Sequence, residues 1–528
     1  MGESSGGDPK DANGELLEEL RARLHATSDA GRPEAVAKRR RTGQRTAREN
    51  VADLIDEGSF MEYGALALAA QRNSRSVEEL VKLSPADGLI CGIGTINRAL
   101  FDEARSRAMV LAYDYTVFAG TQGVIGHRKM DRMLALAERH RLPVVLFAEG
   151  GGGRPNDADV QTVAGLDTPT FLGFAALSGL VPRVGIASGR CFAGNAALLG
   201  CCDAIIATSD STTGMGGPAM IEGGGLGTFK PEEVGPVEVQ SKNGVVDVRV
   251  GDEAEAVAVA KKYLSYFQGP VSGWTAADQA SLRAALPENR RRAYKIRPIV
   301  ETLADAGSVL ELRRDFGRSL VTALARVEGR PLGVIASDTN HLAGAIDADA
   351  ADKAARFLQL CDAFGLPIVS LCDTPGFMVG PQAETTALVR HVSRIFANAA
   401  ALSVPYLTVV LRRGYGLGAQ AMAGGHFRAP LFTVSWPSGE FGAMNLEGAV
   451  KLALRKELEA IADPAEREQL LRGAVAVAQE RGKAINMASL LELDAVIDPA
   501  DTRTWIARGM RAAIPAPREG RRRMVDAW

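Results

Sequence analysis

The sequence lacks the features that mark secreted, membrane-spanning or nucleic-acid-binding proteins. It has no run of about 20 apolar residues, which a membrane span requires, and no apolar N-terminal segment that would direct secretion. Its six cysteines form no C-x-x-C pair, so we expect neither a zinc site nor a disulfide framework. The formal net charge of -2 argues against general binding to nucleic acid. We therefore expect a cytoplasmic protein with reduced cysteines and no metal.

Several enzyme signatures are also missing. The chain has no P-loop, no H-E-x-x-H, no G-x-S-x-G and no M-K-M lysine to which biotin could be attached. The stretch GYGLGA at 414–419 fits a dinucleotide-binding pattern after a predicted strand. We disfavour that interpretation because the matching turn in the other half of the chain lacks the pattern.

The chain does contain an internal repeat. RKMDRMLALAERHRLPVVLF at 128–147 resembles DKAARFLQLCDAFGLPIVSL at 352–371, and Lys129 matches Lys353. Both segments predict an amphipathic helix, a turn at proline and a buried strand. Because 528 residues exceed what one core of about 250 to 300 residues holds, we predict two copies of one α/β fold. A linker is expected near 270–295, which is rich in charge and helix breakers, and a long helical stretch is expected at 448–482. The predicted organisation is a disordered lead-in at 1–30, a first domain at 31–275, a second domain at 290–510 and a basic tail at 511–528, whose Trp528 could dock on a neighbour.

Each half carries a glycine-bearing turn between a strand and a helix, at 190–200 (RCFAGNAALLG) and 412–424 (RRGYGLGAQAMAG). Such a turn leaves the first N–H groups of the helix without acceptors, so it suits a developing negative oxygen. A simple packing turn is the alternative. Binding is favoured because both turns are in repeat register and each neighbours a further loop, at 149–154 (EGGGGR) or 373–380 (DTPGFMVG). A glycine-rich loop at 214–227 occurs only in the first half, where it is expected to line a pocket.

A basic segment, KRRRTGQRTAR at 38–48, opens the first half. Arginine grips phosphate bidentately, so Arg45 and Arg48 are candidates for a phosphate clamp. The alternative is a solvated helix face. Arg297 stands at the position equivalent to Arg48 in the second half, which favours a shared structural role for that pair.

The segment at 31–64, both glycine turns and the Pro-Gly-Phe loop together resemble the carboxyltransferase (beta) subunits of biotin-dependent acyl-CoA carboxylases, such as the acetyl-, propionyl- and methylcrotonyl-CoA carboxylases. The resemblance covers roughly residues 30–510. It implies two tandem crotonase-like domains and an enzyme of fatty acid metabolism. Its reaction moves a carboxyl group from carboxybiotin to the α-carbon of an acyl-CoA, through an enolate held by two backbone oxyanion holes, and requires no protein base.

The resemblance also implies partners and site residues. Biotin would come from a separate (alpha) subunit that carries biotin carboxylase and biotin carrier domains, and the chain would form a hexamer, a dimer of trimers. Acyl-CoA would bind the first domain and biotin the second. The implied catalytic residues are Ala193, Gly194, Leu417 and Gly418. The implied acyl-CoA-binding residues are Arg45, Arg48, Glu149, Gly151, Gly152, Met215 and Gly216. The implied biotin-binding residues are Pro375, Gly376, Phe377, Gly416 and Gln420.

Three positions depart from the family pattern. Glu149 begins a loop that is usually Asp-Ser-Gly-Gly-like, Leu417 stands where glycine or alanine is usual, and Val248 replaces a histidine. Two alternatives therefore stay open: another crotonase-fold acyl-CoA enzyme, such as a decarboxylase, and a non-catalytic acyl-CoA-binding scaffold subunit. The sequence leaves the acyl chain length open.

Overall fold

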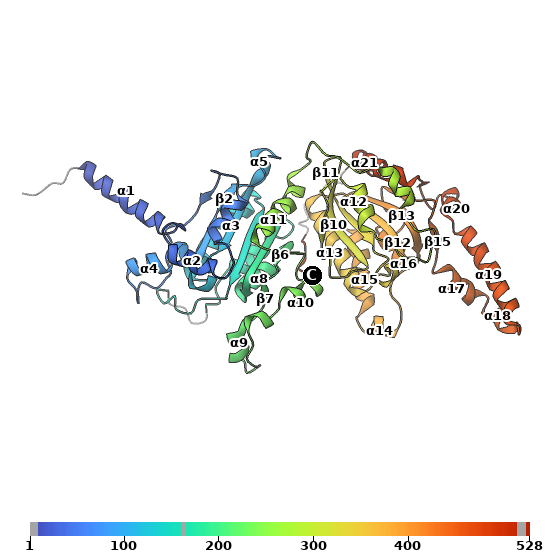
Figure 1. Cartoon of the computed structure of the whole chain (residues 1–528), viewed down its shortest axis with the longest axis horizontal. Coiled ribbons are helices and arrows are strands. Elements are labelled where there is room, and N and C mark those ends of the chain that lie inside the picture. Colours follow the sequence, from blue (N-terminus) through green and yellow to red (C-terminus); the bar gives the residue numbers. More distant parts are fainter. Residues whose placement is uncertain (1–8, 161–164, 515–523) are drawn as a thin grey trace, which may run out of the picture. The chain divides into compact units, whose positions relative to one another are not determined.

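The computed structural model describes residues 9–160, 165–514 and 524–528 (Figure 1). These residues form two compact units. The first contains the residues up to Gln240 and Arg249–Ser265, and the second contains Ser241–Val248 and Tyr266–Asp526 together with Trp528. The border between them falls inside helix α11 (Glu253–Gln268). The segment at 270–295, where composition predicts a linker, lies in the second unit because Leu282 and Tyr294 are buried in its core.

The first unit is built on a parallel-rich sheet in which β1 to β6 lie in sequence order. β2 and β3 are antiparallel, whereas β3, β4, β5 and β6 are parallel. Nearly every residue of β3, β4 and β5 is buried, as expected for strands covered on both faces of a sheet. The strands are β1 (Met61–Glu62), β2 (Leu89–Thr95), β3 (Arg107–Tyr113), β4 (Val144–Gly150), β5 (Arg183–Phe192), β6 (Ala204–Thr208), β7 (Thr212–Gly214), which pairs with the end of β5, and β8 (Val248–Val250), which lies next to β6.

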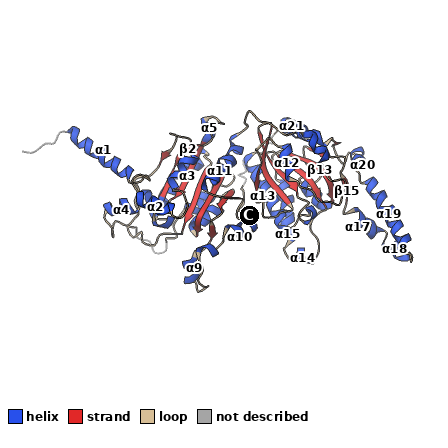
Figure 2. Ribbon diagram, in the orientation of Figure 1, coloured by secondary structure: helices blue, strands red, loops and turns tan. Residues whose placement is uncertain are grey.

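The second unit repeats this arrangement, with β9 to β14 in order and β15 paired with the end of β13 (Figure 2). Even an irregularity is repeated: the register shifts between Ala148 and Gly150 in β4 and between Cys372 and Thr374 in β12. The prediction of two copies of one α/β fold is confirmed. The strands are β9 (Leu310–Leu312), β10 (Leu320–Val327), β11 (Arg330–Ser337), β12 (Ile368–Thr374), β13 (Tyr406–Tyr415), β14 (Phe432–Ser435), β15 (Glu440–Gly442) and β16 (Ala495–Val496).

The two long repeated helices explain why Lys129 and Lys353 match. Lys129 in α6 (Val124–His140) donates to the carbonyl oxygens of Ala86 and Leu89. In the second unit, Lys353 in α13 (Ala348–Phe364) donates to the carbonyl oxygens of Phe316 and Leu320. Each buried ammonium thus satisfies carbonyl groups at the start or flank of its sheet. The other α-helices are α1 (Pro9–His25), α2 (Pro33–Arg40), α3 (Ala47–Leu54), α4 (Val77–Leu83), α5 (Glu103–Ser106), α7 (Thr170–Ala175), α8 (Gly194–Gly200), α9 (Pro218–Gly223), α10 (Val237–Lys242), α12 (Arg297–Leu303), α14 (Pro381–Glu384), α15 (Leu388–Ala400), α16 (Gly416–Met422), α17 (Leu446–Ala453), α18 (Arg455–Ala460), α19 (Pro464–Arg481), α20 (Ala484–Ser489) and α21 (Thr502–Ala512).

The two ends of the chain differ from the predicted loose segments. Within the lead-in predicted to be disordered, Pro9–His25 is helical, and Arg21 pairs with Glu18 three residues earlier; residues 1–8 lie outside the described residues. In the tail, residues 515–523 lie outside the described residues. Trp528 docks on the second unit, where its Nε1 donates to Asp352 at 2.9 Å and its ring packs edge-on against Phe316.

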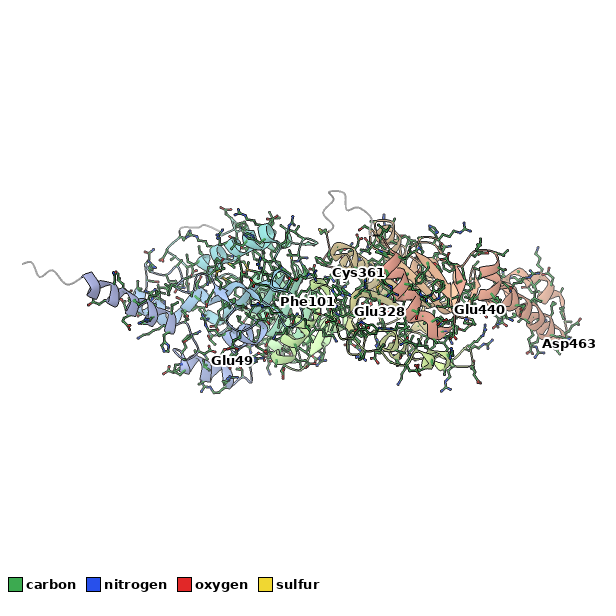
Figure 3. All side chains as sticks on the ribbon, turned by 90° about the horizontal axis from the view of Figure 1, so that it is seen from above. Glu49, Phe101, Glu328, Cys361, Glu440 and Asp463 are labelled. Carbon is green, nitrogen blue, oxygen red and sulfur yellow. The ribbon has the colours of Figure 1, made fainter. Side chains whose placement is uncertain are left out.

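The helical stretch expected at 448–482 comprises α17, α18 and α19, with Asp463 capping the start of α19 (Figures 1 and 3). The six cysteines are free thiols, and Cys361 is buried in α13 (Figure 3). Across the described ranges, no helix combines the length and the apolar character needed to cross a bilayer.

Candidate active site

The first glycine turn joins β5 directly to α8. Ala193, at the junction, has φ +51° and ψ -120°, a strained backbone conformation for a residue other than glycine. Its N–H donates to the carbonyl oxygen of Gly214 at 3.1 Å, and its carbonyl accepts from Ala197 at 2.9 Å. The N–H of Gly194 therefore begins the helix without a helical acceptor. Of the two residues predicted at this turn, Gly194 is the one whose N–H has no acceptor among the described residues.

Glycine is required around this donor for steric reasons. A Cβ on Gly152 would lie 2.9 Å from the Cβ of Ala193 and 3.7 Å from the nitrogen of Gly194. A Cβ on Gly194 would lie 2.1 Å from Oε1 of Gln122. The glycine-rich loop after β4 thus lies directly against the turn, and a side chain at either glycine would collide with its neighbours.

A cavity of about 630 Å³ opens beside this donor. Of the residues predicted to bind acyl-CoA, Gly151 and Gly152 line it, whereas Met215 and Gly216 do not. The loop that contains them lines the cavity with the residues that follow, Gly217 and Pro218, where α9 begins. Most of the lining is apolar or glycine: Gln122, His127, Gly151, Gly152, Gly153, Gly165, Leu166, Thr168, Phe171, Phe192, Ala193, Gly194, Gly217, Pro218, Ala219 and Met220.

The side chain of Glu149 lies away from this lining, in a buried ion pair with Arg39. Two hydrogen bonds join them, from Nη1 to Oε1 at 2.7 Å and from Nη2 to Oε2 at 2.6 Å. Burial raises the pKa of Glu149 to about 7, and the Arg39 guanidinium opposes that rise. Glu149 therefore anchors the base of the glycine-rich loop to α2.

Arg45 and Arg48, the predicted phosphate contacts, are both engaged by the protein. Arg45 pairs with Asp53 at 2.8 Å, and Arg48 pairs bidentately with Glu62. The equivalent Arg297 pairs in the same way with Glu311. The repeated pair is the shared structural role that the sequence match favours. Among the described residues of the basic segment, Lys38 and Arg41 are exposed and have no ion-pair partner.

The second turn joins β13 to α16 through Gly416, which has φ +55°. Tyr415 and Phe192 hold equivalent places at the ends of their strands. Leu417 is therefore the counterpart of Gly194, and its side chain is 60% exposed, pointing away from the core. A Cβ on Gly418 would lie 2.6 Å from the Cα of Gly376. The backbone of the Pro-Gly-Phe loop thus touches the start of α16.

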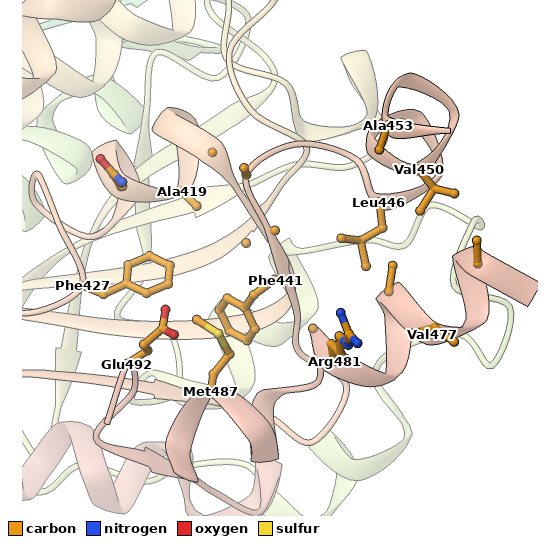
Figure 4. Close-up of a pocket in the computed structure, with 18 of the residues that line it drawn as sticks. Ala419, Phe427, Phe441, Leu446, Val450, Ala453, Val477, Arg481, Met487 and Glu492 are labelled. Atoms are coloured by element: carbon orange, nitrogen blue, oxygen red, sulfur yellow. The ribbon is translucent and has the colours of Figure 1, made fainter. Parts of the chain in front are cut away.

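A second cavity, of about 890 Å³, lies beside this turn and under the helices α17 and α19 (Figure 4). Gly416 and Gln420 line it, whereas the other predicted biotin-binding residues, Pro375, Gly376 and Phe377, do not. The predicted catalytic residues Leu417 and Gly418 do not line it either. Sequence reasoning missed its large side chains because no motif contains them. Figure 4 shows them surrounding the space: Phe427, Phe441, Leu446, Val450, Val477, Arg481, Met487 and Glu492.

The part of the chain that the structure describes holds no cluster of three or more His, Cys, Asp or Glu side chains able to bind a metal ion. Two repeated α/β units, each with a glycine turn facing a cavity, define the class of crotonase-like enzymes that stabilise an oxyanion with backbone groups.

Comparisons with known proteins identify the family. Residues 38–524 match the carboxyl transferase domain. The chain is 30% identical, over 96% of both chains, to the methylmalonyl-CoA carboxyltransferase 12S subunit of Propionibacterium freudenreichii subsp. shermanii. It is 30% identical, over 94% of both chains, to the biotin-dependent long chain acyl-coenzyme A carboxylase beta4 subunit of Mycobacterium tuberculosis. The chain belongs to the carboxyl transferase domain family.

Solved structures agree. A single-chain, multi-domain long-chain acyl-CoA carboxylase is 59% identical, with a TM-score of 0.89; the match covers 93% of this chain and 48% of that one, so this chain spans about half of that protein. The transcarboxylase 12S subunit, a hexamer crystallised with methylmalonyl-CoA, is 28% identical with a TM-score of 0.82 over 99% of this chain and 100% of that chain. The predicted crotonase-like fold and carboxyltransferase class are confirmed.

Proposed function

We propose that this chain is the carboxyltransferase component of a biotin-dependent acyl-CoA carboxylase, with acyl-CoA on the first unit and biotin on the second. The observation that carries the proposal is the N–H of Gly194, free at a helix start and opening onto an apolar cavity. An enolate formed from a thioester bears its charge on the carbonyl oxygen. A fixed backbone donor at that oxygen stabilises the transition state without rearranging as the charge develops.

The first unit binds and orients the thioester. The Gly194 N–H holds the carbonyl oxygen, and the close approach of Gly152 keeps side chains away from it. No side chain is assigned as the base for the α-proton; the ureido nitrogen of biotin, left without its carboxyl group, would accept that proton. For the CoA phosphates, Lys38 and Arg41 are more available than the predicted Arg45 and Arg48, because the latter are already paired with carboxylates.

The second unit fits the bicyclic ring of biotin. Gly416 and Gln420 line a cavity of about 890 Å³ walled by Phe441 and Met487, and the backbone of Gly376 lies directly against Gly418 at the turn. The N–H groups of Leu417 and Gly418, in the first turn of α16, would hold the ureido oxygen. Bound carboxybiotin would supply the carboxyl group, delivered by a separate biotin-bearing subunit.

The size and lining of the first cavity favour an acyl chain longer than the two or three carbons of acetyl or propionyl groups. Cavities of roughly 300 to 1,000 Å³ hold ligands of drug size, and this one has a volume of about 630 Å³ with Phe171, Phe192 and Met220 in its wall. The 59% identity to a long-chain acyl-CoA carboxylase supports the same substrate class. By analogy with the 12S hexamer, we propose a hexameric assembly.

The test is carboxylation in vitro. The chain is purified with its biotinylated partner and supplied with ATP, radiolabelled bicarbonate and acyl-CoAs from acetyl to palmitoyl. We expect label to be fixed into long-chain esters. A charged biotin without fixation into any ester would overturn the proposal in favour of the scaffold function, and release of CO₂ from a carboxyacyl-CoA without biotin would favour a decarboxylase.

A further inference from the structure

We infer that Asn195 is a positioning residue that fixes the N–H groups of Gly194 and Gly152 as a two-donor oxyanion hole. The inference rests on the proposed function, because it concerns the same thioester oxygen. Asn195 follows Gly194 in α8, and its side chain is fully buried beneath the turn.

The side-chain amide of Asn195 bonds three carbonyl groups from two loops. Its Nδ2 lies 2.9 Å from the oxygen of Gly120, 3.2 Å from that of Glu149 and 3.0 Å from that of Gly151. Glu149 and Gly151 belong to the glycine-rich loop after β4, and Gly120 to the turn after β3. One side chain at the start of α8 therefore holds the glycine-rich loop, which lines the cavity, and the turn after β3, which leads to the cavity-lining Gln122.

These bonds determine where the Gly152 N–H points. The C=O and N–H of a trans peptide unit point in opposite directions. Because the carbonyl of Gly151 points at the buried Asn195 amide, the N–H of Gly152 in the same peptide unit points away from it. Gly152 lines the cavity beside Gly194, and its N–H has no acceptor among the described residues. A second donor thus faces the cavity from the side opposite Asn195.

Gln122 braces the amide itself. Its Nε2 donates to Oδ1 of Asn195 at 3.0 Å, which fixes the amide with its Nδ2 toward the three carbonyls. The same nitrogen lies 3.1 Å from the hydroxyl of Tyr113. The backbone N–H of Gln122 also donates to the carbonyl of Gly152 at 2.9 Å. Both peptide units that flank Gly152 are therefore held by named partners.

The second unit builds the equivalent region without such an amide, so the helix turn alone does not require one. Gly418 takes the place of Asn195, and the hydroxyl of Thr374 donates to the carbonyl of Gly344, the counterpart of Gly120. The same hydroxyl accepts from the N–H of Gly376 at 3.1 Å. The Asn195 brace is thus specific to the unit proposed to hold the thioester.

The experiment compares Asn195→Ala with the wild-type complex. A displaced donor weakens binding of the transition state more than that of the substrate, so we expect kcat for carboxyl transfer to fall about 10- to 100-fold while KM for acyl-CoA changes less than threefold. Asn195→Asp keeps the shape but removes the two N–H donors, and should lose at least as much. Ser84→Ala is the control, because Ser84 is equally buried in the same unit and bonds the backbone of Ala69 and Leu80, away from the cavity.

The outcomes separate this inference from the proposed function. A wild-type complex that fixes no label overturns both. An active wild type with an Asn195→Ala variant of normal kcat, or one whose loss appears only in KM, overturns the inference alone. Should Asn195→Ala fail to fold, Gln122→Leu breaks the brace while leaving the amide in place, and the same drop in kcat at constant KM is expected; its absence overturns the inference.

Discussion

Arg39 and Glu149 lie 110 residues apart in sequence and form a bidentate ion pair that is almost completely shielded from solvent. Arg39 stands on α2, and Glu149 occupies the end of β4, one residue before the strand passes into the glycine-rich loop. The pair therefore ties the basic opening segment of the first unit to the loop that borders the cavity. Glu253 adds a second carboxylate 3.8 Å from the same guanidinium.

Removing one member of this pair should destabilise the first unit strongly. In Arg39→Met, Glu149 loses its partner while it stays buried, and such a loss costs about 3 to 5 kcal/mol. The double variant Arg39→Met/Glu149→Leu should recover much of that cost because the carboxylate that Arg39 bonds directly is removed with it, while Glu253 keeps its hydrogen bond from Ser188. Urea unfolding measures all three proteins. Arg21→Met, which breaks an exposed pair, should change the free energy of unfolding by less than about 1 kcal/mol. A double variant no more stable than the single one would contradict the argument.

Gly152→Ala should abolish most of the carboxyl transfer without unfolding the protein. The added methyl group would lie 2.9 Å from the Cβ of Ala193 and 3.7 Å from the nitrogen of Gly194, so it would crowd the donor. Loss of one oxyanion donor costs about 100- to 1,000-fold in kcat, and we expect a loss of that size. Gly200→Ala is the control because a Cβ there meets nothing within 4 Å. Equal activity of the two variants would show that the Gly194 donor is not used.

Gly418→Ala should act on the second unit in the same way. Its methyl group would lie 2.6 Å from the Cα of Gly376, so the Pro-Gly-Phe loop must move. We expect carboxyl transfer to fall at least 100-fold, while acyl-CoA binding to the first unit, measured by calorimetry, stays within twofold of the wild type. Weakened acyl-CoA binding together with intact transfer would reverse the assignment of substrates to the two units.

Lys353 should make stability depend on pH. Burial lowers its pKa from the ordinary value of 10.5 to about 7. Between these values the unfolded chain holds the proton and the folded chain does not, so the free energy of unfolding rises with pH, by up to about 1.4 kcal/mol per pH unit. Below about pH 7 Lys353 is protonated in both states, so it adds no pH dependence there. Lys353→Met removes the effect. The free energy of unfolding of the wild type minus that of the variant, measured by urea unfolding, should therefore increase from pH 7 to pH 9. A constant difference would contradict the lowered pKa.

The sequence predicts those parts of the structure that depend on local pattern. An apolar run, a glycine and a helix start predict the strand-to-helix turns. The constant offset between matched residues, such as Lys129 and Lys353, predicts the repeat. Neither the pair of Arg39 with Glu149 nor the bonds of Asn195 could be predicted, because each joins segments far apart in the chain with no motif to connect them. Composition marks charge and helix breakers at 270–295, whereas packing of Leu282 and Tyr294 places that segment in the second unit, so contact packing and composition give different borders.

The two halves of this molecule support equivalent loops with different atoms: Asn195 from a helix in one, Thr374 from a strand in the other. A duplicated gene product usually begins with identical supports, and a change that improved one copy would have been available to both. With separate supports, the loop over one cavity can be reshaped at Asn195, whose counterpart Gly418 has no side chain to support a loop. Each half can then evolve toward a new ligand while its twin keeps the old one.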